Sequence, residues 1–125
     1  MGGFGELEAT VMDLLWSRPD PATVRDVQRA LETERPLAYT TLMTVMDRLH
    51  SKGWLSRTME GRAYSYQPTA TKEEHSAQLM TDALGSSADR TATLVHFLEQ
   101  MDAADAKRLR SVLDDRGAAR RKRGK

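Results

Sequence analysis

The stretch from Leu37 to Thr69, LAYTTLMTVMDRLHSKGWLSRTMEGRAYSYQPT, decides the fold because it predicts a helix followed by a hairpin. Between positions 38 and 50 the apolar residues recur at steps of three and four, which is one face of a helix: Leu42, Val45, Met46 and Leu49. Gly53 then ends the helix, because glycine readily takes the left-handed cap conformation. Positions 54–59 and 62–67 alternate apolar and polar residues around Glu60-Gly61, which predicts a β-hairpin turning there.

The opposite face of this helix is polar and carries mostly short side chains: Thr40, Thr41, Thr44 and Arg48. Short hydroxyl side chains allow a helix to approach base edges, and arginine pairs with guanine or phosphate. Arg57 and Arg62 lie on the hairpin, where they would meet a DNA backbone. The pattern favours a winged helix-turn-helix, although a merely solvated helix face remains the alternative on this stretch alone.

Two shorter helices precede this stretch, at 5–16 and 23–31, separated by a segment with two prolines. Thr23 and Asp26 have the spacing of a capping box at the start of the second helix. Three helices followed by a hairpin is the order of a winged-helix domain, which we expect over residues 1–69. The predicted fold is therefore mostly α, with a small β-hairpin as the wing.

Three more amphipathic helices are predicted at 71–84, 91–101 and 103–113. Short helices of this kind need partners for their apolar stripes, so we predict a dimerisation region over residues 70–115. The alternative is that the stripes cover the winged domain itself. The predicted interface residues are Leu79, Met80, Leu84, Leu94, Val95, Leu98, Met101, Leu109, Val112 and Leu113.

Charge alone does not indicate nucleic acid, since the net charge of the 125 residues is +1. Residues 116–125 hold six of the 19 Lys and Arg residues and no acid, which leaves 13 basic against 18 acidic side chains before them. We expect this end to be a basic, disordered tail. The absence of cysteine, of a signal-peptide pattern and of a long apolar run favours a cytoplasmic protein without membrane insertion.

The residues that enzymes and metal sites require are missing. His50, His75 and His96 are far apart and have no partner at metal-ligand spacing. No glycine-rich phosphate loop and no nucleophile elbow occurs. We therefore expect no catalytic residues, no metal and no cofactor.

The segments GELEATVMDLLW, TVRDVQRAL, LAYTTLMTVMDRLHSKGWL and GRAYSYQPT resemble, in order, the penicillinase and methicillin-resistance repressor family (BlaI/MecI). The resemblance covers residues 5–113 and implies a dimeric winged-helix repressor of palindromic operators, which controls β-lactam resistance or cell-wall stress genes. It adds further DNA-contacting candidates on the helix, the wing and the start of the second helix: Tyr39, Gly61, Tyr64, Thr23 and Arg25.

The resemblance also implies relief of repression by a sensor-dependent protease that cuts the C-terminal helical part. The family is cut at an Asn-Phe bond, to which His96-Phe97 corresponds in this sequence. The related copper-responsive branch ends in a cysteine cluster, and that mechanism is excluded here because cysteine is absent.

We therefore predict a homodimeric repressor in which Thr41 and Thr44 lie at base edges while Arg48 and Arg62 hold phosphates. One alternative is a winged domain that serves only protein–protein contact, since a fold does not determine function. Another is a DNA-binding regulator released by a small effector instead of by proteolysis.

Overall fold

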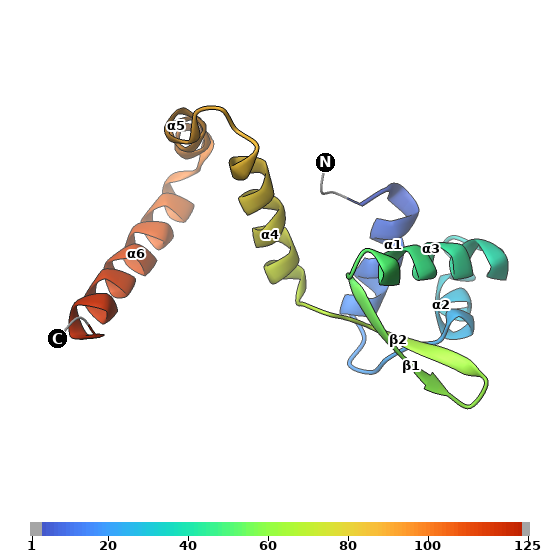
Figure 1. Cartoon of the computed structure of the whole chain (residues 1–125). Coiled ribbons are helices and arrows are strands. Elements are labelled where there is room, and N and C mark those ends of the chain that lie inside the picture. The colour runs from blue at the N-terminus through green and yellow to red at the C-terminus, as the bar shows by residue number, and fades with distance from the viewer. Residues whose placement is uncertain (1–3, 124–125) are drawn as a thin grey trace. The chain divides into compact units, whose positions relative to one another are not determined.

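The computed structural model describes residues 4–123, with side chains as far as Ala118, and confirms a mostly helical fold with one hairpin (Figure 1). The elements in chain order are α1 (Glu6–Trp16), α2 (Val24–Leu31), α3 (Tyr39–Ser51), β1 (Leu55–Glu60), β2 (Ala63–Pro68), α4 (Lys72–Gly85), α5 (Arg90–Gln100) and α6 (Ala103–Arg123). The described chain forms two compact units, which divide between Asp82 and Ala83.

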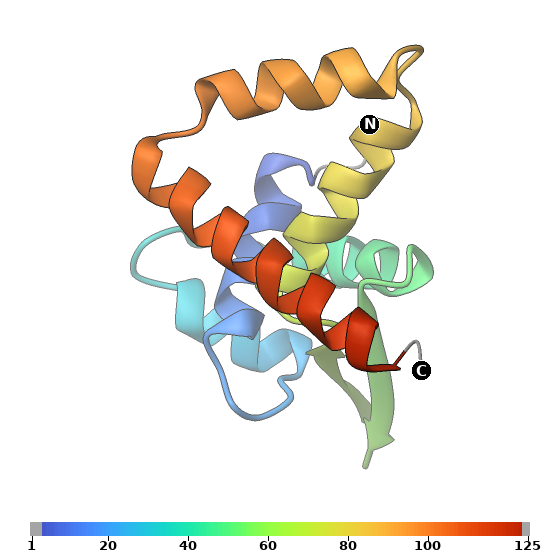
Figure 2. The same ribbon diagram turned by 90° about the vertical axis from the view of Figure 1, so that its left-hand side faces the viewer.

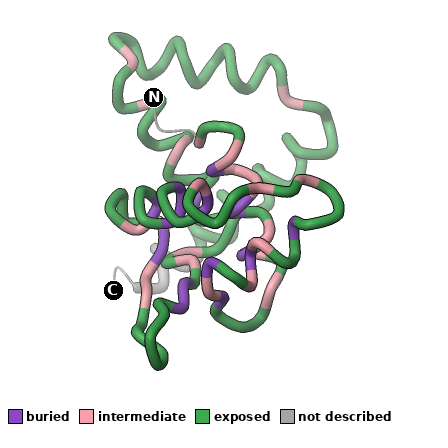
Figure 3. The backbone as a smooth tube through the Cα atoms, turned by 90° about the vertical axis from the view of Figure 1, so that its right-hand side faces the viewer, coloured by how far each residue is buried: buried purple, intermediate pink, exposed green. Residues whose placement is uncertain are grey.

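The core of the first unit is formed by the apolar faces of α1, α2 and α3, by one residue from each strand and by Ala22 just before α2 (Figure 3). Its buried members are Val11, Met12, Leu15, Ala22, Val24, Val27, Leu31, Leu42, Val45, Met46, Leu49, Leu55 and Tyr66. The four apolar residues that predicted the face of α3 are all in this list. Burial on one side leaves the other side of α3 facing out, which is what a recognition helix requires.

The wing is an antiparallel hairpin whose register runs from Leu55 opposite Pro68 to Glu60 opposite Ala63. Its turn is therefore Gly61-Arg62, one position later than the predicted Glu60-Gly61. Gly61 has a φ of 64°, and no other residue of the described hairpin has a positive φ, as in a type II′ turn. At the base of the wing, the backbones of Ala22 and Tyr66 exchange hydrogen bonds of 2.9 and 2.8 Å.

The end of α3 is set by Gly53, as the sequence predicted. Gly53 has a φ of 87°, and its amide donates to the carbonyl of His50 at 3.0 Å. The amide of Trp54 donates to the carbonyl of Leu49 at 3.0 Å, which completes a Schellman motif. The chain can therefore turn directly from the recognition helix into the wing.

The first unit extends beyond the predicted boundary at Thr69, because the start of α4 packs on it. His75 of α4 is only 4% exposed. Its ring lies among three others: Phe4 at 4.3 Å, Trp54 at 4.1 Å and Trp16 at 5.5 Å between ring centroids. The indole of Trp16 also donates to the carbonyl of Ala70 at 3.0 Å. Periodicity could not predict this packing, since it gives no reason to place a histidine in a core.

The second unit contains α5 and α6, two separate helices joined near Met101 (Figure 2). Asp89 begins α5, since its carboxylate accepts a hydrogen bond from the amide of Ala92 at 3.0 Å. The disorder predicted for residues 116–125 is not seen in the described part, because α6 continues to Arg123. Alanine, arginine and lysine favour helix, and Gly117 costs only about 1 kcal/mol within it.

Candidate nucleic-acid interface

The polar residues predicted to read DNA lie on the outer side of α3. Thr40, Thr44 and Arg48 are exposed, and Thr41 is half-buried. The hydroxyl of Thr44 donates to the carbonyl of Thr40 at 3.0 Å, which leaves its oxygen free to accept from a base amino group. The first turn of α3 has no side-chain cap. Its backbone amides therefore donate to no capping side chain. This side of α3 offers several donors and acceptors to a groove.

The starts of α2 and α3 lie close together. The guanidinium carbon of Arg25 is 5.8 Å from the ring centroid of Tyr39, and both side chains are exposed. The hydroxyl of Thr23 accepts from the amide of Asp26 at 3.1 Å, and the Asp26 carboxylate accepts from the amide of Thr23 at 3.0 Å. These contacts, above all that with the Thr23 amide, lower the pKa of Asp26. Thr23 is thus chiefly the helix cap that the sequence predicted, whereas Arg25 is available to a ligand.

The tip of the wing carries an exposed arginine. Arg62 follows Gly61 in the two-residue turn and is exposed, and Tyr64 is 39% exposed on β2. Two methionines that the sequence did not single out, Met43 and Met59, are 45% and 52% exposed. Exposed apolar side chains next to polar ones suit contact with sugar and thymine methyl groups.

Arg57 differs from Arg62 because its guanidinium already has partners within the protein. Its Nη1 lies 3.0 Å from Oδ1 of Asp47 on α3, and its guanidinium carbon lies 4.1 Å from the ring centroid of Tyr64. The side chain of Arg57 is only 24% exposed. Tyr66 and then Asp47 raise the pKa of Arg57 above its ordinary value, so it is charged at every physiological pH.

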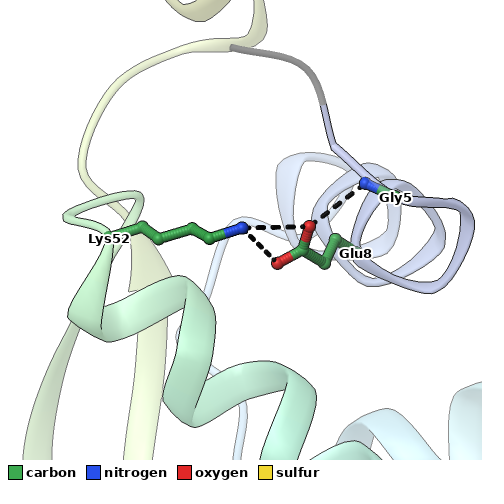
Figure 4. A network of polar contacts seen from close by, with 3 residues as sticks. All are labelled: Gly5, Glu8 and Lys52. Carbon is green, nitrogen blue, oxygen red and sulfur yellow. Dashed lines mark hydrogen bonds and ion pairs between the residues drawn. The ribbon is translucent and has the colours of Figure 1, made fainter. Parts of the chain in front are cut away.

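A buried carboxylate holds the other end of α3 (Figure 4). Glu8 of α1 accepts from Nζ of Lys52 at 3.0 Å and from the amide of Gly5 at 3.1 Å. Burial alone would raise the pKa of Glu8, but the Gly5 amide and Lys52 outweigh it, and the pKa lies below its ordinary 4.5. Glu8 therefore stays charged at neutral pH and joins the start of α1 to the end of the recognition helix.

Reasoning from the sequence alone missed Asp47, Glu8 and Lys52 as parts of this framework. Asp47 and Arg57 are ten residues apart across a helix and a strand, a spacing that no periodic pattern marks. Glu8 lies in the first turn of α1, where the helix dipole alone is enough to explain an acidic residue. Charged pairs between different elements depend on packing, which local spacing does not specify.

The apolar residues predicted to form a dimer interface are largely uncovered in the single chain. Exposed fractions are 57% for Met80, 45% for Leu94, 46% for Val95, 51% for Leu98, 36% for Leu109, 53% for Val112 and 58% for Leu113. Leu79, Leu84 and Met101 are half-buried. In the candidate cleavage pair, the side chain of His96 is 78% exposed and Phe97 is 44% exposed.

Neither a metal site nor a membrane-spanning helix occurs within residues 4–123. No group of three or more His, Asp or Glu side chains there could hold a metal ion. No helix in that range is both long and apolar enough to cross a membrane.

A three-helix unit with a polar third helix beside a β-hairpin defines a winged helix-turn-helix protein. The solved DNA-binding domain of the repressor BlaI is similar, with a TM-score of 0.52, 25% identity, and coverage of 58% of this chain and 88% of that domain. The fold is also similar to that of MepR, a transcription regulator of the Staphylococcus aureus multidrug efflux pump MepA. That TM-score is 0.50 at 13% identity, over 93% of this chain and 79% of MepR, and it speaks to the fold alone.

Residues 4–115 match the penicillinase repressor family. The transcriptional regulator BlaI of Mycobacterium tuberculosis strain H37Rv is 47% identical over 112 residues, which are 87% of this chain and 81% of that protein. The chain belongs to the penicillinase repressor family, a family of transcriptional regulators. The resemblance seen in the sequence, the winged-helix fold and the expectation of a non-enzymatic protein are thereby confirmed.

Proposed function

We propose that this protein is a cytoplasmic transcriptional repressor that binds a palindromic operator as a homodimer. The observation that carries the proposal is the exposed polar side of α3 next to a wing whose tip presents Arg62. In this arrangement Thr41 and Thr44 lie at base edges in the major groove, and Arg48 holds a phosphate. Arg62 and Tyr64 contact the backbone beside the groove, while Arg25 and Tyr39 contact the phosphates at the helix starts.

The homodimer is supported by the uncovered apolar residues of the second unit. None of the residues of α5 is buried, although Leu94, Val95 and Leu98 lie on it. Large apolar side chains gathered on adjacent helices mark an interface with another chain. A second copy is the occupant that the DNA-binding role favours, because two recognition helices then read two half-sites.

The proposed physiological role is repression of β-lactam resistance or cell-wall stress genes, relieved by proteolysis between His96 and Phe97. Both residues are exposed, and they lie within α5, whose residues are all exposed. In the single chain α5 has no buried residue, so the local opening that gives a protease access to this bond costs little free energy there. The family's name and the similarity to BlaI support the genes proposed here.

The DNA-binding proposal is tested by fluorescence anisotropy with a duplex from upstream of the protein's own gene and a scrambled duplex. We expect tight, salt-sensitive binding to the upstream duplex at two chains per duplex, because phosphate contacts release counterions. Equal and weak binding to both duplexes would overturn the proposal. An affinity for DNA that does not fall as salt is added would also contradict the proposal. That result would favour a protein-contact module.

The dimer is tested with Leu113→Asp, which places a charge in the exposed apolar stripe of α6. Its matched control is Ser111→Asp, which is also at an exposed position and lies a little over half a turn from Leu113 on the same helix. We expect Leu113→Asp to shift the mass measured by light scattering from two chains towards one, and Ser111→Asp to leave it unchanged. A dimer that survives Leu113→Asp as well as it survives the control would place the interface elsewhere.

Proteolytic relief is tested by adding the protein to extracts of its own cells grown with and without a β-lactam. Mass spectrometry should find a break between His96 and Phe97 only with the treated extract. Phe97→Asp should resist the cut, whereas Ser111→Asp on α6 should not. Loss of operator binding without any break in the chain would instead favour release by a small effector.

A further inference from the structure

Arg57 is the one arginine of the wing whose guanidinium is held on two sides within the first unit. The Asp47 carboxylate binds it from α3 at 3.0 Å, and the Tyr64 ring lies under it at 4.1 Å. We propose that Arg57 is a positioning residue that holds the wing against the recognition helix, and that it is not itself a phosphate contact. This inference rests on the proposed binding of DNA.

The outer half of the wing needs such support. The inner half is anchored by buried Leu55 and by the paired backbones of Ala22 and Tyr66. From Thr58 to Tyr64 every residue is exposed, so Arg57 is the last partly buried residue of β1 before the tip. A two-stranded hairpin is only marginally stable by itself. Without the contacts of Arg57 to Asp47 and Tyr64, the position of Arg62 relative to α3 would vary.

The position of Asp47 on α3 also favours an Arg57 that stays within the protein. Asp47 is three residues after Thr44, on the face of α3 that is proposed to meet DNA, and its side chain is 61% exposed. An unpaired carboxylate there would repel phosphate, and Arg57 compensates its charge. If Arg57 moved to a phosphate, it would lose Asp47 and Tyr64 and leave that carboxylate facing the DNA backbone. The geometry therefore favours an arginine that stays with Asp47 in the complex.

The first test compares the salt dependence of operator binding for Arg57→Gln and Arg62→Gln in the full chain. Each lost phosphate contact lowers the slope of log K against log salt by about 0.9, or about 1.8 for the two copies in a dimer. We expect this reduction for Arg62→Gln and an unchanged slope for Arg57→Gln. The affinity of Arg57→Gln for the operator should still fall about three- to ten-fold, because an ion pair and a cation–π contact are lost. An equal reduction of the slope by both variants would overturn the proposal.

The second test is a double-mutant cycle with Asp47→Asn and Arg57→Gln, read as the ratio of affinities for operator and scrambled duplex. Both single variants should lower this ratio, and the double variant should lower it no further, since each single change already breaks the pair. If Asp47 only repelled DNA and Arg57 only bound phosphate, Asp47→Asn would strengthen operator binding and the two effects would add. That result would overturn the proposal.

The third measurement needs no DNA, so that it separates this inference from the proposed function. Hydrogen exchange of the amides of residues 58–64 should become faster in both single variants and no faster in the double variant. Thermal melts monitored by circular dichroism serve as the control for overall folding. If the wild-type protein did not prefer the operator, the proposed function would be wrong. Unchanged hydrogen exchange in the variants would refute the role of Arg57 whatever the outcome with DNA.

Discussion

The neutral form of His75 contributes to the stability of the first unit, and this gives a prediction that depends on pH. Its ring is 4% exposed among three aromatic side chains, and neither ring nitrogen has a hydrogen-bond partner among the residues that the structure describes. Burial lowers the pKa of His75 below its ordinary value of 6.5. Just below pH 6.5, His75 therefore binds a proton in the unfolded chain but stays neutral in the folded chain.

The magnitude follows from proton linkage. The stability contribution of neutral His75 is complete above pH 6.5 and is lost as the pH falls from 6.5 towards the folded-state pKa. Within that window the free energy of unfolding falls by up to about 1.4 kcal/mol per pH unit for one proton. His75→Phe removes this dependence and keeps the stacking on Phe4. It also removes two buried unpaired nitrogens, each costing about 1–3 kcal/mol, so we expect no loss of stability at pH 7.5.

The assay is urea unfolding of wild type and His75→Phe at pH 7.5, 6.5 and 5.5, at one protein concentration. The only two tryptophans, Trp16 and Trp54, both lie against His75, so their fluorescence reports on this cluster. The control is His96→Phe, whose side chain is 78% exposed and whose change should leave the pH dependence of the wild type intact. If His75→Phe and wild type lost stability equally between pH 7.5 and 5.5, the reasoning about the buried neutral ring would be refuted.

Four further predictions concern stability and are checked by thermal or urea unfolding. Met46→Ala leaves a cavity at a position with 0% exposure and should cost about 2–5 kcal/mol; a cost below 1 kcal/mol would mean that the core repacks freely. Thr23→Ala removes the cap of α2 and should cost about 1 kcal/mol, whereas Thr23→Ser should cost much less. Gly53→Ala places a side chain at a φ of 87° and should cost about 1–2 kcal/mol, and a neutral result would contradict the left-handed cap. Glu8→Gln should lower stability at neutral pH but not well below the lowered pKa of Glu8, because the native carboxyl is itself protonated there. Equal losses of stability at both pH values would refute the ion pair with Lys52.

Much of the secondary structure could be predicted because its causes are local. The apolar spacing on α3 depends on residues within one or two turns, and the cap at Gly53 depends on one residue type. The hairpin was predicted one position early, since the turn dipeptide Glu60-Gly61 carried little preference of its own. Residues 116–123 were predicted to be disordered because of their charge, whereas helix propensity extends α6 through them.

The candidate interface was also predictable in part, because a polar face on a helix and an arginine on a turn are visible in the sequence. Thr40, Thr44, Arg48 and Arg62 are exposed as expected. Their roles towards DNA stay predictions until the variants are measured. Arg57 and Arg62 looked equivalent in the sequence, and only the contacts in space distinguish them.

The sequence by itself determined the order of helices and hairpin, the faces that could be buried, and the resemblance to the penicillinase repressors. The tertiary structure decided which distant side chains meet: Asp47 with Arg57, Glu8 with Lys52, and His75 with the aromatic rings around it. The physical reason is the sequence separation over which each kind of interaction acts. Propensity, capping and periodicity act between residues within a few positions, whereas ion pairs and core contacts between elements exist only after those elements have packed.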